Sequence, residues 1–154
     1  MSLTWQDNLL YKDEVLIAEL PALIANVALI HQGYLVLFDT YDLSIQLAAR
    51  SGQTYPLPIK HGNIFCLNPG GTFKWQMMLQ LGTAGYFAVD TVHIVGDRLF
   101  MVFQDDHQLY TDYYEMDVES GVCTRITEAI YKSVCHEAEQ TGHPPRLMSS
   151  WTNG

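Results

Sequence analysis

Residues 63–76 read NIFCLNPGGTFKWQ, and this stretch predicts two short β-strands joined by a tight turn. Apolar residues lead into Asn68, after which Pro69 presets the backbone for a turn and the next glycines can supply a positive φ. We therefore expect an antiparallel hairpin with Gly70 or Gly71 at positive φ. The Asn68 side-chain oxygen is expected to hold a nearby backbone N–H group.

A similar order of residues returns in YYEMDVESGVCTRI, residues 113–126. Here Asp117 begins the turn and Gly121 supplies the positive φ. The stretches upstream also correspond, because residues 28–39 and 92–105 are both glycine-centred hairpin candidates. Each unit then consists of two hairpins, which makes four antiparallel strands.

The predicted architecture is a single mainly β domain spanning residues 1–154, with repeat-like units at about 27–77 and 92–126 and a helix at about 127–140. Apolar residues recur at helical spacing in the last segment, Thr127 is suited to cap it, and prolines follow its end. The continuous apolar runs YLVLF and LFMVF are typical of strands covered on both sides. We expect the two units to pack as a sandwich or an open barrel.

The turn chemistry of residues 63–76 resembles the outer hairpin of a PQQ-like or kelch-type β-propeller blade, and also short stretches of small uncharacterised bacterial β proteins. The resemblance implies four-stranded, blade-like units. A closed propeller needs about four or more blades, and this chain holds two units. The resemblance therefore implies no central channel, cofactor or functional residue.

The balance of acidic and basic residues indicates which kinds of binding partner to expect. The chain has 17 acidic against 8 basic residues and a formal net charge of -9. Scattered Lys and Arg disfavour nucleic acid and anionic membrane surfaces, whereas a basic protein or a cation is favoured. Because neither a signal peptide nor a membrane span is visible, we expect a cytoplasmic protein.

The motifs of common enzymes and cofactor sites are not found. The sequence has no nucleotide-binding glycine motif, no nucleophile elbow, no zinc-protease motif and no C-x-x-C pair, so no cofactor is expected. Cys66, Cys123 and Cys135 fall in predicted strands or in the helix. We expect reduced, mostly buried thiols, whose pKa burial raises.

The densest polar cluster is Asp105, Asp106 and His107. Carboxylates and an imidazole could hold a divalent cation, and that cation could activate water for hydrolysis. The simpler interpretation is a polar loop between two strands.

Aromatic side chains offer a second candidate site. We single out Trp75, Tyr86, Tyr110 and Tyr113 as residues for binding a ligand or a partner, since aromatic clusters often build pockets and interfaces. The alternative is an ordinary β core, in which aromatic residues are also common.

The leading hypothesis is a non-enzymatic, acidic binding protein. Its partner would be a basic protein or a small apolar or cationic ligand, and one version, by analogy, is an immunity-type inhibitor of a toxin. The alternative is a metal-assisted hydrolase at Asp105, Asp106 and His107. We also expect a homodimer, because the strand at Leu99–Phe103 carries no charge and must be central or paired across an interface.

Overall fold

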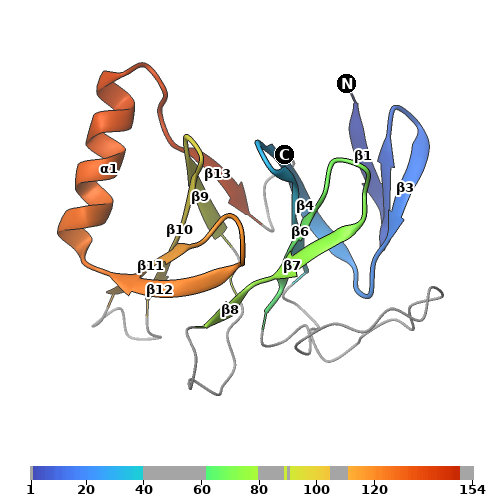
Figure 1. The fold of residues 1–154 in the computed structure, drawn as a ribbon, viewed down its shortest axis with the longest axis horizontal. Coiled ribbons are helices and arrows are strands. Elements are labelled where there is room, and N and C mark those ends of the chain that lie inside the picture. Colours follow the sequence, from blue (N-terminus) through green and yellow to red (C-terminus); the bar gives the residue numbers. More distant parts are fainter. Residues whose placement is uncertain (1, 40–61, 80–88, 90, 105–110, 150–154) are drawn as a thin grey trace.

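The computed structural model describes residues 2–39, 62–79, 89, 91–104 and 111–149 (Figure 1). In these ranges the protein is mainly β, with three sheets and one helix. The elements are, in chain order, β1 (Leu3–Gln6), β2 (Leu9–Lys12), β3 (Val15–Glu19), β4 (Ile24–Ile30), β5 (Gly33–Phe38), β6 (Ile64–Leu67), β7 (Phe73–Gln76), β8 (Met78–Leu79), β9 (Thr91–Val95), β10 (Arg98–Gln104), β11 (Thr111–Met116), β12 (Val122–Ile126), α1 (Glu128–Gln140) and β13 (Arg146–Ser149).

The three sheets follow one another along the chain. The N-terminal sheet has the order β1-β2-β3, and the central sheet has the order β4-β5-β6-β7. The six-stranded sheet has the order β13-β9-β10-β11-β12-β8. Neighbouring strands are antiparallel, except that β8 runs parallel to β12 with Met78 opposite Val122. The chain thus passes from β7 of the central sheet directly into an edge strand of the six-stranded sheet.

The predicted hairpins are confirmed. Within the two sheets, β4 pairs with β5, β6 with β7, β9 with β10 and β11 with β12, all antiparallel. Gly71 has a φ of 98° and Gly121 a φ of 76°. Sheet pairing does not test descent from a common repeat, so the relation between the two units stays a prediction.

The two turns differ in how their first side chain is used. As predicted, Asp117 Oδ1 accepts hydrogen bonds from the backbone N–H groups of Glu119 and Ser120. Asn68 instead donates its amide nitrogen to Thr72 Oγ1 at 3.0 Å. The backbone of the first turn is already closed by Gly71 N–H donating to Asn68 O, so the side chain bridges the turn instead of capping it.

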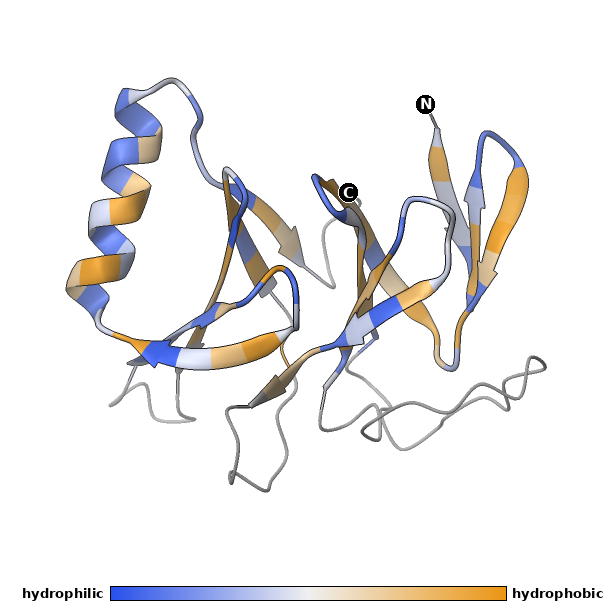
Figure 2. Ribbon diagram, viewed as in Figure 1, coloured by the Kyte–Doolittle hydropathy of each residue, from blue (hydrophilic) through white to orange (hydrophobic). Residues whose placement is uncertain are grey.

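The central sheet is covered on both faces, as the run YLVLF predicts. Every residue of β5 is buried. Leu35 and Leu37 lie in the core shared with the six-stranded sheet, whereas Tyr34 and Phe38 lie in the core shared with the N-terminal sheet. Figure 2 shows the strands of this middle layer as largely hydrophobic.

The N-terminal sheet is the cover for the second face of the central sheet. Its strand β3 ends at Glu19, two residues before Pro21, which has no N–H group to continue the ladder. Leu3, Trp5 and Leu10 of the other two strands pack into the core shared with the central sheet.

The helix α1 covers part of the outer face of the six-stranded sheet (Figure 1). Its predicted cap is confirmed, because Thr127 Oγ1 accepts a hydrogen bond from Ile130 N–H at 3.2 Å. None of its residues is fully buried, and Ile130 is 46% exposed. The helix is therefore attached by a few side chains and not by a buried face.

The strand β10 lies in the middle of its sheet, between β9 and β11. Leu99 and Phe100 pair with both neighbouring strands, and the rest of the uncharged stretch to Phe103 pairs with β11. This is the central placement that the sequence offered as one of two options, and it requires no second copy. A homodimer stays a prediction.

Candidate functional site

Several predicted site residues lie outside the described part of the chain. These are Asp105, Asp106, His107, Tyr86 and Tyr110. Elsewhere, in the ranges that the structure describes, no group of three or more His, Cys, Asp or Glu side chains is placed to hold a metal ion. The metal-assisted hydrolase thus stays a prediction from the sequence.

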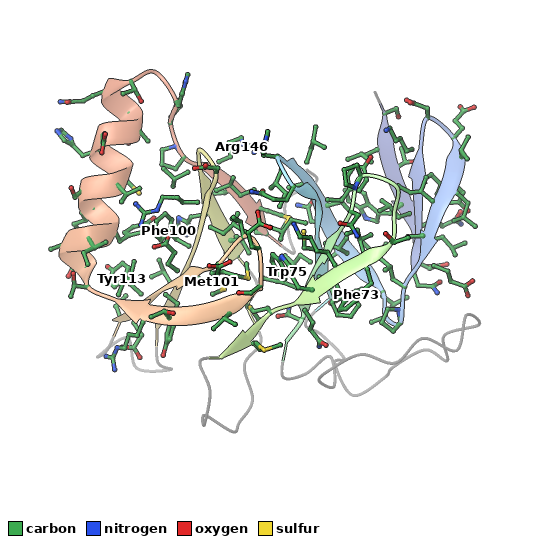
Figure 3. The ribbon with its side chains drawn as sticks, in the orientation of Figure 1. Phe73, Trp75, Phe100, Met101, Tyr113 and Arg146 are labelled. Atoms are coloured by element: carbon green, nitrogen blue, oxygen red, sulfur yellow. The ribbon has the colours of Figure 1, made fainter. Side chains whose placement is uncertain are left out.

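Trp75, one of the predicted ligand-binding residues, lies between two sheets (Figure 3). Its side chain is 4% exposed, and its indole Nε1 donates a hydrogen bond to Val118 O at 2.9 Å. The β11–β12 turn makes room for the ring at Gly121, where an added Cβ would lie 2.4 Å from Trp75 Cε3. The structure thus places Trp75 in the core that joins the central sheet to the six-stranded sheet.

Two of the three cysteines, Cys66 and Cys123, are poor nucleophiles in this fold. Cys66 and Cys123 are buried, and burial raises the pKa of their thiols to about 11 and about 12. Both thiols are therefore protonated at neutral pH, and the thiolate is the reactive form.

Tyr113 belongs to an aromatic cluster under the helix. Tyr131 of α1 lies with its ring centroid 5.2 Å from Tyr113, 5.6 Å from Phe100 and 5.6 Å from His93. Its hydroxyl is also hydrogen-bonded to His93 Nδ1 at 2.7 Å. These contacts fasten α1 to the outer face of the six-stranded sheet.

Burial sets the protonation states of His93 and Tyr131. It lowers the pKa of His93, which favours the neutral ring at pH 7. It raises the pKa of the Tyr131 hydroxyl, which therefore keeps its proton. We assign the Tyr131 hydroxyl as the donor and the neutral His93 Nδ1 as the acceptor, an arrangement that holds the helix against the sheet.

The part of this sheet face beyond the aromatic cluster is hollowed into a groove of about 440 Å³. The strand register explains its position, because Glu115 of β11 lies opposite Phe100 on one side and Thr124 on the other. We call this the acidic groove, and it is lined by Asp97, Arg98, Glu115, Met116, Asp117, Val118, Val122, Thr124 and Ile126.

Arg98 is the one basic residue in this lining. Its Nε and Nη2 atoms donate to the two carboxylate oxygens of Glu115, each at 2.7 Å, and its guanidinium lies 5.2 Å from the Phe100 ring centroid. The hydrogen bond with Glu115 raises the pKa of Arg98, and the negative charges of Asp97 and Glu137 raise it further. One guanidinium therefore lies among several carboxylates, so the groove carries an excess of negative charge.

Sequence reasoning missed this groove. Arg98 and Glu115 are 17 residues apart, and neither belongs to a recognisable motif. Their pairing depends on the register between β10 and β11, which brings Phe100 opposite Glu115 and leaves Arg98 diagonal to it. The signal that could have found it is an Arg beside the Gly96 turn together with an outward-facing Glu in the next hairpin.

Comparison with known proteins adds no relative. No protein-family model, no curated protein and no solved structure matches this chain. In the described ranges no helix has the length and apolar content needed to cross a membrane.

Proposed function

We propose that the protein is a non-enzymatic binding protein whose acidic groove takes a basic segment of a protein partner. The observation that carries the proposal is the surplus of carboxylates around Arg98 in an open groove. The net charge of -9 acts in the same direction at longer range. An immunity-type inhibitor that masks the basic site of a toxin is one version of this function, in a cytoplasmic setting.

The two kinds of lining side chain suit the two parts of a Lys or Arg residue. Val122 and Ile126 are half-buried apolar residues that could contact the aliphatic stem. Asp97 is exposed at the turn between β9 and β10, where it could meet the charged end. Arg98 is already committed to Glu115, so an incoming cation is drawn to the remaining carboxylates.

Attraction of this kind has a kinetic signature. Complementary charges at the rim of an interface mostly accelerate association, and salt screens them over a Debye length of about 8 Å at physiological ionic strength. We therefore expect association with a basic segment to slow as salt is added, with a smaller change in dissociation.

The test uses two labelled peptides of opposite charge, acetyl-RVRVRV-amide and acetyl-EVEVEV-amide, and fluorescence anisotropy at low and physiological salt. We expect the basic peptide to bind and the acidic one not to bind. Replacing one acid of the lining and one acid whose charge acts on Arg98, Asp97→Asn with Glu137→Gln, should weaken binding about tenfold if each removed charge contributes about 0.7 kcal/mol.

A matched control variant distinguishes binding at the acidic groove from a general effect of the net charge. Asp7→Asn with Glu14→Gln removes the same charge from exposed turns of the N-terminal sheet, and binding should be nearly unchanged. Equal weakening by both double variants would contradict the groove as the site. Failure of the basic peptide to bind at low salt would contradict the function.

A further inference from the structure

A second groove, with no lining residue in common with the acidic groove, lies where two sheet edges meet. The strand β4 forms one edge of the central sheet, β13 forms one edge of the six-stranded sheet, and the two strands are neighbours in space (Figure 1). The space between them is about 350 Å³ and is lined by Asn26, Val27, Ala28, Leu29, Ile94, Arg146, Leu147 and Met148. We call it the edge groove.

The lining of the edge groove is mostly apolar. Ile94 and Met148 are buried at its base, whereas Leu29 and Leu147 are 45% and 61% exposed. Covering these exposed leucine side chains with an apolar group is favourable, because it removes apolar surface from water.

Two polar residues line the edge groove, and one of them has hydrogen-bond donors left for a ligand. The Asn26 side chain donates to Ser149 O at 3.0 Å and accepts from Val27 N–H at 2.8 Å. Arg146 is exposed and donates one Nη2 bond to Leu29 O at 3.3 Å, which leaves most of its N–H groups for another acceptor (Figure 3).

Arg146 differs from Arg98 and Arg125 in its ion pairing. Arg98 is paired with Glu115 and Arg125 with Asp112, and the lysines Lys74 and Lys132 also have carboxylate partners. Arg146 has no carboxylate partner within the described ranges, although the chain carries many more acids than bases. A guanidinium beside an apolar groove is complementary to an anion attached to an apolar chain.

We propose that the edge groove binds a small aliphatic carboxylate. The carboxylate is held by the free N–H groups of Arg146, and the alkyl chain lies between Leu29 and Leu147 over Ile94 and Met148. The volume is near the lower end for ligand pockets, which favours a short chain. The net negative charge of the chain opposes anions at long range, so binding depends on the local contact with Arg146 and on the covered apolar surface.

The probe is octanoate, titrated into the full chain and followed by the methyl resonances of Leu, Met, Ile and Val in two-dimensional NMR. We expect saturable shifts at Leu29, Leu147 and Met148. Octylamine, which has the opposite charge, and butyrate, which has a shorter chain, should both bind at least tenfold more weakly.

Arginine variants test whether Arg146 holds the carboxylate. Arg146→Gln should weaken octanoate binding about tenfold, which is the usual scale for one charge-assisted contact, and Arg146→Lys should fall between the two. Arg125→Gln is the matched control, because Arg125 is an exposed arginine of the same sheet outside the groove, and it should bind octanoate like the parent chain. Since Arg146 is exposed, its variants should keep the unfolding midpoint of the parent.

The proposal would be overturned by the absence of saturable shifts, by octylamine binding as tightly as octanoate, or by equal losses in the Arg146 and Arg125 variants. Shifts centred on Val122 and Ile126 would also overturn it, since they would place the ligand in the acidic groove. Each of these results leaves the peptide experiment on the acidic groove unaffected.

Discussion

The central sheet and the outer face of the six-stranded sheet are covered in very different ways. The strand β5 is buried along its whole length, with sheets packed on both of its faces. Among the described residues, the outer face of the six-stranded sheet is covered by α1, a helix in which no residue is fully buried. Beside the helix the face stays open as the acidic groove. The difference shows that the middle layer contributes most of the buried core, whereas the lightly covered face leaves accessible surface for the binding that we propose.

The largest contrast should come from truncating one side chain in each region. Leu35→Ala in β5 removes a fully buried side chain and should cost about 2–5 kcal/mol in the free energy of unfolding. Ile130→Ala in α1 removes a side chain that is 46% exposed and should cost less than about 0.5 kcal/mol. Urea unfolding measures both, and similar losses would remove the distinction.

Two turn glycines of the six-stranded sheet sharpen the comparison. Gly121 and Gly96 both have positive φ, but an added Cβ would collide with Trp75 at Gly121 and would meet nothing within 4 Å at Gly96. Gly121→Ala should therefore cost about 2–4 kcal/mol, the sum of backbone strain and overpacking. Gly96→Ala should cost about 1 kcal/mol from backbone strain alone.

Urea midpoints of the two glycine variants check this expectation. Equal midpoints would show that Trp75 can move aside, and the seam between the central and six-stranded sheets would then be looser than the contact with Val118 O indicates.

A smaller effect is expected where the helix is fastened. Tyr131→Phe removes the hydrogen bond to His93 Nδ1 and should cost about 1 kcal/mol. Tyr11→Phe serves as the control because Tyr11 is half-buried in the N-terminal sheet, away from α1, and it should change little. Amide hydrogen exchange should show faster exchange in α1 for the Tyr131 variant alone, and uniform faster exchange would contradict a local fastening.

The smallest expected effect is a pH dependence centred on the same contact. Burial lowers the folded-state pKa of His93, so the unfolded chain binds more protons as the pH falls below the ordinary value of 6.5. The contribution of His93 to stability is therefore complete above that pH and declines toward the lower folded-state pKa. Urea midpoints on either side of 6.5 should differ less in His93→Gln than in the parent. An unchanged pH dependence in the variant would assign it to other groups.

Local turn and cap chemistry explains why much of the β structure could be predicted. Gly71 and Gly121 sit at positions where only glycine adopts positive φ easily, and Thr127 caps the helix as its hydroxyl suggests. The strands β1, β2, β8 and β13 escaped prediction because they are short. In addition, β8 and β13 pair with β12 and β9, which lie far away in the chain.

The candidate site was harder to predict than the fold because it depends on pairs formed across strands. The pair of Arg98 and Glu115 needs the correct register of two hairpins, and a slip of one residue would send Glu115 to the opposite face. The role of Trp75 was equally hard to predict. A large aromatic residue in a strand suits a pocket and a core equally well until its neighbours are known.

The meeting of β4 and β13 also has a consequence for how the chain is made. Asn26 donates to Ser149 O across 123 residues, and β13 forms the edge of the sheet beside β9. Contacts so distant in sequence form late and slow the search for the native state. A ribosome that has not yet released Arg146–Ser149 therefore carries two sheets whose facing edges are unfinished, with Met148 missing from the core between them. The contact between β4 and β13 is therefore completed only after Arg146–Ser149 has left the ribosome.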